Sequence, residues 1–245
     1  DDNPAEREIV RRELPAVSVP ELTAPEEYIR AIDRAGYFEA TVLSADDRKR
    51  AEMYKQNQQR AALEQSFGNY EDYLHSLEMV CEMGSFSPAH AERITQLINK
   101  TNQFNLTTRR YTAAEVEGIM QDPACLTLYG KLTDKFGDNG IVTAIIGHQT
   151  GEVLEIDLWI MSCRTFKRRL EHAMFDQLVA DAAARGVKTI VGRYLPTAKN
   201  LLVSDFYATI GFEKTAENED GSRTFAFTGF DGYQPQCGVM EIRRV

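Results

Sequence analysis

The stretch from Val153 to Thr165 most constrains the fold of this 245-residue chain. Apolar residues recur at alternate positions in Val-Leu-Glu-Ile-Asp-Leu-Trp-Ile-Met, which predicts a β-strand over 153–161. The strand ends in Ser162-Cys163-Arg164, and the pattern after it predicts a helix over about 167–184. A further strand is expected at 187–191. This order of strand, helix and strand is typical of an α/β fold.

The remaining pattern from Tyr73 onward supports the same class. The sequence predicts a mixed central sheet flanked by helices, with the Gly137–Gly140 turn joining two of the strands. Further strands are expected at 77–83, 126–132, 141–146 and 239–242, helices at 89–101, from Thr112 and over 200–210, and hairpins around 148–151 and 220–221.

The N-terminal part is expected to be helical and charged. Pro4 to Leu14 predicts a short helix that Asp2 or Asn3 caps. Helices are also expected from Ala24 to near Gly36 and over 45–67, the latter as a solvated connector. The expected domains are 1–24, a helical connector over 25–72, the α/β domain over 73–232, and a C-terminal strand and tail over 233–245.

Composition excludes several functional classes. The 37 acidic and 28 basic residues give a net charge of −9, which argues against a general nucleic-acid binder. No apolar run reaches the roughly 18 residues that a membrane span needs, and no signal peptide is recognisable. The four cysteines form no CxxC pair and show no metal-like spacing with the four histidines. These features predict a reduced cytoplasmic protein, and the initial Asp suggests a fragment or a processed form.

Cys163 is the first candidate for chemistry. A thiolate is the reactive form of cysteine, and cations or a helix N-terminus favour it. Arg164 is adjacent in sequence, and His172 lies one to two turns into the following helix, where it could approach the thiol as a base. Two alternatives stay open: Cys163 is an activated nucleophile or a buried structural cysteine, and His172 is a base or a packing residue.

Two polar segments are further candidates. The run from residue 102 to 109 could cap a helix or bind a hydroxylated substrate, and both interpretations stay open. At the N-terminus, Asp1 and Asp2 could ligate Mg²⁺ through carboxylate oxygens, or simply cap a helix. The candidate binding residues in the run are Asn102, Asn105, Thr107, Thr108 and Arg109.

The strand end at Cys163, the helix after it and the segment from Asp205 to Phe212 resemble the N-acetyltransferase (GNAT-like) fold. The resemblance implies that the strand end and the helix N-terminus hold a thioester and its pantetheine arm. It also implies that Tyr207 lies near the thioester sulfur as a general acid, although a core aromatic beside Phe206 is the alternative. Arg164–Arg169 contains no glycine, so the backbone cradle of an acetyl-coenzyme A pyrophosphate is expected to be compromised.

Several strings together resemble a more specific family, the FkbH-like proteins, which join a haloacid-dehalogenase (HAD) superfamily phosphatase half to a GNAT-like half. Thr-Asn-Gln-Phe-Asn-Leu-Thr-Thr and Ser-Cys-Arg are the most specific of these strings. The matching segments are 1–7, 35–39, 50–54, 100–109, 136–140 and 162–164.

This resemblance implies a function. Such proteins take a D-glyceryl unit from 1,3-bisphosphoglycerate and load it onto the phosphopantetheine thiol of an acyl carrier protein for polyketide biosynthesis. Cys163 is then the residue that carries the acyl group, Arg164 contacts the substrate, and Asp1 and Asp2 bind Mg²⁺ with the rest of the HAD half, whose nucleophile motif this sequence lacks. The alternatives are an acyl-coenzyme A-dependent N-acyltransferase and a non-catalytic docking domain for the carrier protein.

Overall fold

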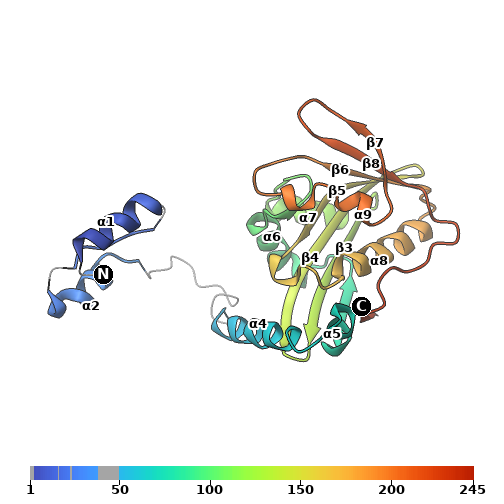
Figure 1. The fold of residues 1–245 in the computed structure, drawn as a ribbon. Coiled ribbons are helices and arrows are strands. Elements are labelled where there is room, and N and C mark those ends of the chain that lie inside the picture. Colours follow the sequence, from blue (N-terminus) through green and yellow to red (C-terminus); the bar gives the residue numbers. More distant parts are fainter. Residues whose placement is uncertain (1–2, 16, 23, 38–49) are drawn as a thin grey trace. The chain divides into compact units, whose positions relative to one another are not determined.

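A mixed β-sheet runs through residues 53–245 of the computed structural model (Figure 1), which describes residues 3–15, 17–22, 24–37 and 50–245. The chain forms two compact units, residues 1–52 and 53–245. The boundary lies within a helix, α4. The domain limits expected from the sequence stay predictions.

The sheet follows the order β7-β8-β6-β5-β4-β3-β1-β9, and a short strand β2 also pairs with β5. Two neighbouring pairs are parallel, β5 with β6 and β1 with β9, and the others are antiparallel. The strands are β1 (Met79–Gly84), β2 (Phe104–Asn105), β3 (Cys125–Asp134), β4 (Gly137–Thr150), β5 (Val153–Met161), β6 (Thr189–Tyr194), β7 (Glu213–Glu217), β8 (Arg223–Phe227) and β9 (Met240–Arg244).

Helices cover both faces of the sheet, because its strands carry buried apolar residues on both sides. The first cluster of buried residues joins α8 (Leu170–Ala184) and α9 (Phe206–Thr209) to the sheet. The second cluster joins α6 (Pro88–Lys100) and α7 (Ala113–Gln121) to the opposite face. The mixed sheet flanked by helices confirms the fold class predicted from the sequence.

The N-terminal helices follow simple capping rules. Helix α1 (Pro4–Glu13) begins after Asn3, whose side chain accepts a hydrogen bond from the Ala5 N–H at 3.0 Å. A 3₁₀ turn (Pro25–Glu27) leads into α2 (Tyr28–Arg34). In the second unit α4 (Arg50–Glu64) precedes α5 (Tyr70–Ser76). None of the helices in the described part has the length and apolar character that crossing a membrane requires.

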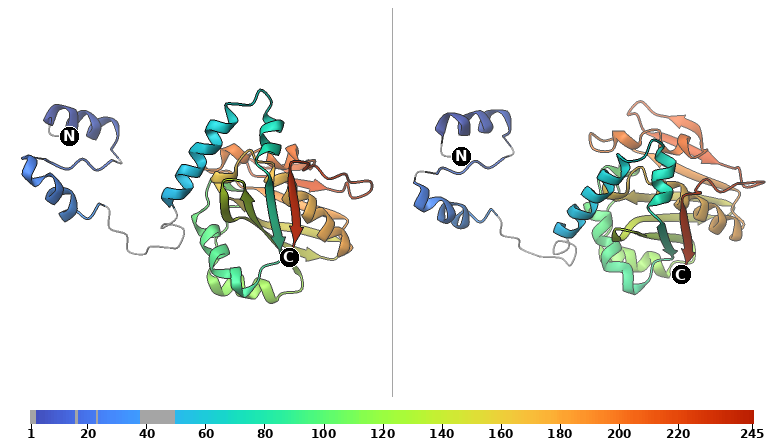
Figure 2. Two further views of the ribbon diagram at one scale, coloured as in Figure 1. Left: turned by 90° about the horizontal axis from the view of Figure 1, so that it is seen from below. Right: turned by 60° about the horizontal axis from the view of Figure 1, so that its bottom comes forward.

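Two elements differ from those predicted. Strands β3 and β4 turn at residues 135–136, not at 137–140, because the Asp134 carboxylate accepts the Phe136 N–H at 2.9 Å and closes the turn early. The predicted helix over 200–210 is a 3₁₀ turn (Leu201–Val203) followed by α9. The strand predicted at 239–242 is present as β9, which pairs with β1 along its length (Figure 2).

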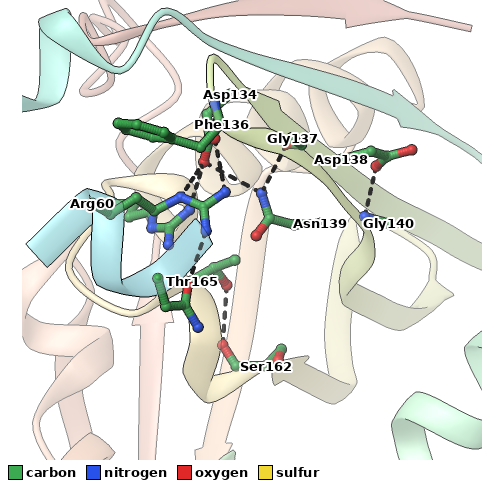
Figure 3. A network of polar contacts seen from close by, with 11 residues as sticks. Arg60, Asp134, Phe136, Gly137, Asp138, Asn139, Gly140, Ser162 and Thr165 are labelled. Carbon is green, nitrogen blue, oxygen red and sulfur yellow. Dashed lines mark hydrogen bonds and ion pairs between the residues drawn. The ribbon is translucent and has the colours of Figure 1, made fainter. Parts of the chain in front are cut away.

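A buried ion network ties α4 to the sheet (Figure 3). Arg60 donates two hydrogen bonds of 2.8 Å to the two carboxylate oxygens of Asp134. Arg168 donates a third, at 3.0 Å. The three side chains are only 4%, 0% and 8% exposed for Arg60, Asp134 and Arg168, respectively. Arg60 is thus a buried anchor in a helix whose other described residues are exposed or half-buried, and the connector role predicted for this helix stays a prediction.

Electrostatics favours the ionised form of this carboxylate. Burial alone raises the pKa of Asp134, but the hydrogen bonds and charges of Arg60 and Arg168 outweigh it and hold the pKa below its ordinary value. Burial and the nearby Arg60 lower the pKa of Arg168, which still stays charged because arginine titrates above about pH 12. One carboxylate thus neutralises only one of two buried guanidinium groups.

We expect Asp134→Ala to destabilise the protein by about 3–5 kcal/mol, because the substitution leaves two buried guanidinium groups without a counter-charge. Chemical unfolding monitored by circular dichroism measures the change. The matched control is Glu152→Ala, which removes an exposed carboxylate paired with Lys188 and should change the unfolding free energy by less than about 1 kcal/mol. Equal effects of the two substitutions would contradict a structural role for the Asp134 network.

The lowered pKa of Asp134 also predicts that the stability of the protein depends on pH. Because the folded-state pKa of Asp134 lies below its unfolded value, its contribution to stability is present above about pH 4 and is lost as the pH falls. Unfolding measured between pH 7 and pH 3 should show a steeper loss of stability for the native chain than for Asp134→Asn. Parallel curves for the two proteins would show that Asp134 is not the linked group.

Candidate active site at the opening between β5 and β6

A β-bulge at Asp157 opens the sheet. On β4, Gly147 pairs with Ile156 and Ile146 pairs with Leu158, so Asp157 is an extra residue in β5. Such a bulge bends the strand that carries it. The parallel pairing of β5 with β6 ends at this position, with Ile156 opposite Gly192. Beyond it the two strands are no longer paired with each other.

A segment of the chain itself bridges the separated strands. Phe104 and Asn105 form β2, which pairs with the end of β5. The next residue, Leu106, donates its N–H to the Trp159 carbonyl at 3.4 Å and accepts the Leu195 N–H at 2.8 Å. Residues 104–106 therefore bond to β5 on one side and to the segment after β6 on the other.

Asn200 anchors this bridging segment. Its side-chain amide donates to the carbonyls of Asn105 and Leu195, both at 2.9 Å. Its side-chain oxygen accepts from the backbone N–H of Thr197 at 2.7 Å. Asn200 is fully buried, so few alternative partners exist for these groups. The polar run 102–109 pointed to the bridging segment, but no pattern in the sequence pointed to Asn200.

Cys163 lies at the end of β5, beside this opening. It begins a 3₁₀ turn (Cys163–Thr165), and its side chain is exposed. The structure thus excludes the buried structural cysteine that was one sequence interpretation. Arg164 donates to the Ser162 hydroxyl at 3.2 Å and approaches the Met53 sulfur at 2.9 Å, so its guanidinium packs against α4.

The loop between Cys163 and α8 has an unusual backbone. Lys167 and Arg169 have φ values of 65° and 62°, in the left-handed region that glycine adopts most easily. The surroundings hold this conformation: Tyr70 donates its hydroxyl to the Lys167 carbonyl at 2.7 Å, and Arg168 is fixed by Asp134. The loop therefore holds two left-handed residues without any glycine, and α8 begins only at Leu170. The compromised pyrophosphate cradle expected from the sequence stays a prediction.

The backbone N–H groups in the first turn of α8 can donate hydrogen bonds to a ligand. No side chain of the described residues caps the helix, whose N-cap is Arg169. The backbone N–H groups of a first helical turn have no partner within the helix and favour anions. Together with the cationic side chains of the loop, this end of α8 can bind a phosphate group.

His172 does not contact Cys163. Within the described residues its Nε2 lies 3.5 Å from an Arg169 nitrogen, and its Nδ1 lies 3.5 Å from a Glu171 carboxylate oxygen. Its side chain is 16% exposed. In this arrangement the imidazole packs beside the loop, and its role as a base stays a prediction.

Tyr207 is part of the aromatic core. Its ring packs against Phe212 and Phe225 with centroid distances of 4.9 and 5.5 Å. A Cβ on Gly192 would lie 2.4 Å from this ring, so the glycine makes room for it. Burial raises the pKa of Tyr207, and its hydroxyl has no partner among the described residues. The general-acid role stays a prediction that requires access for a substrate.

The polar run divides into structural and exposed members. Asn105 and Thr107 are buried; the Asn105 side chain accepts the Thr108 N–H, and the Thr107 hydroxyl donates to the Asp157 carbonyl at 2.7 Å. Thr108 has a positive φ of 58° and completes this turn. The buried pair thus holds the bridging segment on the bulge.

Arg109 and Asn102 are the exposed members of the run. Arg109 pairs with the Asp157 carboxylate at 3.1 Å, and Asn102 accepts a hydrogen bond from Arg110. Both are available to a ligand only after these contacts are exchanged. Asp1 and Asp2 lie outside the described residues, so the magnesium site expected there stays a prediction.

Comparisons with known proteins concern the fold. No protein-family model and no curated protein matches the chain. Among solved structures, the ribosomal-protein-S18-alanine N-acetyltransferase from Escherichia coli is 14% identical, with a TM-score of 0.46 over 60% of this chain and 92% of that one. Aminoglycoside 6'-acetyltransferase type Ii is 19% identical, with a TM-score of 0.47 over 60% of this chain and 96% of that one.

A third solved structure is an aminoglycoside 6'-N-acetyltransferase complexed with coenzyme A. It is 16% identical, with a TM-score of 0.45, over 60% of this chain and 96% of that one. The likeness to each of these structures covers 60% of this chain.

We expect Asn200→Ala to loosen the bridging segment, because the substitution removes the side-chain donor to the carbonyl of buried Asn105 and to that of Leu195. Hydrogen exchange should speed up at the amide of Leu106, and the unfolding free energy should fall by about 1–3 kcal/mol. The control is Asn218→Ala in the β7–β8 hairpin, where Asn218 donates only to Ser222. Unchanged exchange at Leu106 would show that Asn200 does not hold the segment.

Proposed function

We propose that residues 53–245 form an acyltransferase domain that passes an acyl group, through a thioester on Cys163, to the phosphopantetheine thiol of an acyl carrier protein. The observation that carries this proposal is the position of Cys163. Its exposed thiol lies at the end of β5, next to the opening in the sheet and directly before the loop that leads to α8. A nucleophile and a phosphate-binding helix end are thus adjacent in the chain.

The phosphate of the pantetheine arm finds suitable partners at the start of α8. The exposed side chains of Lys167 and Arg169 flank the uncapped first turn of the helix. Arg168, between them, faces inward and is occupied by Asp134. A single phosphodiester needs fewer donors than the three phosphates of coenzyme A, and a basic rim also suits an acidic carrier protein.

In the proposed reaction Cys163 carries the acyl group between an acyl phosphate and a thiol. Its thiolate attacks the carbonyl of the acyl phosphate, a C–S bond to Cys163 forms, and the C–O bond to the phosphate breaks, so that phosphate leaves. The pantetheine thiolate of an acyl carrier protein then attacks the Cys163 thioester, a new C–S bond forms, and the C–S bond to Cys163 breaks. The released Cys163 thiolate takes up a proton, and the two thioesters have nearly equal energies.

The acyl group in this proposal is D-glyceryl, which the FkbH-like resemblance implies. In that family the HAD half produces the unit from 1,3-bisphosphoglycerate with Mg²⁺, and the present proposal concerns the acyl-handling half. The product is a glyceryl carrier protein for polyketide biosynthesis.

A second candidate is an N-acyltransferase that uses acyl-coenzyme A. The left-handed conformations of Lys167 and Arg169 favour it, because they give the loop before α8 a backbone shape otherwise expected from glycine. The similar solved structures are of acetyltransferases, one of them complexed with coenzyme A, and this supports the second candidate better than glyceryl transfer. It predicts direct transfer to an amine with no acyl-cysteine.

Intact-protein mass spectrometry distinguishes the two candidates. The chain is incubated either with glyceryl-phosphopantetheine thioester or with acetyl-coenzyme A, and labelled peptides are then mapped. We expect one glyceryl group on Cys163, its loss on addition of a carrier protein bearing free phosphopantetheine, and no adduct in Cys163→Ser. Cys125→Ser is the matched control and should be labelled like the native chain.

Two other results would lead to different conclusions. Acetylation of a test amine from acetyl-coenzyme A, unchanged in Cys163→Ser, would support the N-acyltransferase and contradict the cysteine relay. No adduct and no transfer with either donor would overturn the proposal and favour a docking domain for the carrier protein.

A further inference from the structure

Three potential metal ligands meet on the face of the sheet that α6 and α7 cover. Cys125 is the first residue of β3, His148 lies near the end of β4, and Asp122 follows α7 directly. The β3–β4 register places Cys125 opposite His148, so both side chains project from the same face. Their ligand atoms and that of Asp122 all lie within 4.8 Å of one another.

The distances suit a tetrahedral ion. The Cys125 sulfur lies 3.6 Å from Oδ2 of Asp122 and 3.8 Å from Nδ1 of His148. A tetrahedral zinc ion, with bonds of about 2.3 Å to sulfur and about 2.0 Å to nitrogen or oxygen, separates such ligand atoms by roughly 3.5 Å. Only small side-chain rotations are needed to bring all three ligands onto one ion.

The backbone around these ligands is already fixed. Oδ1 of Asp122 accepts the Ala124 N–H at 2.9 Å, which orients the carboxylate and leaves Oδ2 toward the sulfur. Arg185 donates to the carbonyls of Pro123 and Cys125, at 3.3 and 3.0 Å. Outer contacts of this kind orient the ligands of a metal site before the ion arrives.

A catalytic cysteine is the competing explanation for the cluster. The carboxylate contacts the sulfur, not the imidazole, so the arrangement is not that of a nucleophilic triad.

We propose that Asp122, Cys125 and His148 bind a zinc-class divalent cation. The thiolate and imidazole select zinc or cobalt over magnesium and calcium, which prefer oxygen ligands. The thiol proton leaves to solvent as the sulfur–metal bond forms. Three protein ligands leave one position for water, and His148 also lines a hollow of about 280 Å³ with Glu155 and Asp157.

The ion would join α7, β3 and β4 at one end of the sheet. Glu155 lies opposite His148 on β5, where Arg193 pairs with it at 3.0 Å. The Glu155 carboxylate therefore forms an ion pair with Arg193, and the Asp157 carboxylate forms one with Arg109. These two pairs hold the carboxylates away from the ion, so the expected protein ligands are three and not five. The inference does not depend on the acyl-transfer proposal.

Cobalt titration of the whole chain tests the site. With Co²⁺ as the probe, we expect about one equivalent to bind and to give a thiolate-to-cobalt absorption band in the near ultraviolet. Cys125→Ser should abolish the band. His148→Ala and Asp122→Asn should each weaken binding by more than the 10–100-fold that is typical of losing an outer-shell partner. Zn²⁺ should displace the cobalt and raise the melting temperature.

Cys163→Ser is the matched control, since it removes the more exposed thiol and leaves the three ligands intact. It should keep the band and the affinity of the native chain. No band in the native chain at saturating Co²⁺, or a band that Cys125→Ser retains and Cys163→Ser loses, would overturn the proposal. Circular dichroism of each variant shows whether a lost band reflects lost ligands or a lost fold.

Discussion

The buried carboxylate of Asp134 holds together the parts that form the candidate active site. It binds Arg60 of α4 and Arg168 of the loop that follows Cys163, and it closes the β3–β4 turn. That loop contains two left-handed residues that are not glycine, each of which costs about 1–2 kcal/mol. Such a conformation persists only where surrounding contacts impose it, and here Asp134 and Tyr70 do so.

The bulge at Asp157 has a different consequence. It separates β5 from β6, and the chain fills part of the resulting opening with its own residues 104–106. A pantetheine arm that enters here must run beside this bridging segment or displace it. The exposed position of Cys163 at the edge of the opening favours the first route, because the thiol is reachable while Tyr207 is enclosed by aromatic rings.

Local patterns explain which elements were predicted correctly. The alternation of apolar residues predicted β5, and the Pro4 and Thr112 positions predicted the starts of α1 and α7. The buried position of Arg60 in α4 was not predicted, because one of many charged residues in a polar sequence gives no sign of a partner 74 residues away. The bulge was also invisible, since Asp157 takes an ordinary polar place in the alternation.

The sequence by itself determined the α/β class, the position of Cys163 at a strand end and the polar run 102–109, because these depend on local periodicity and order. Only the tertiary structure decided what these residues contact. Cys125 and His148 lie 23 positions apart and fit no metal spacing, yet the β3–β4 register places them opposite each other. Strand register and helix packing depend on many weak contacts between residues that are far apart in the sequence, so they cannot be predicted from any short stretch of it.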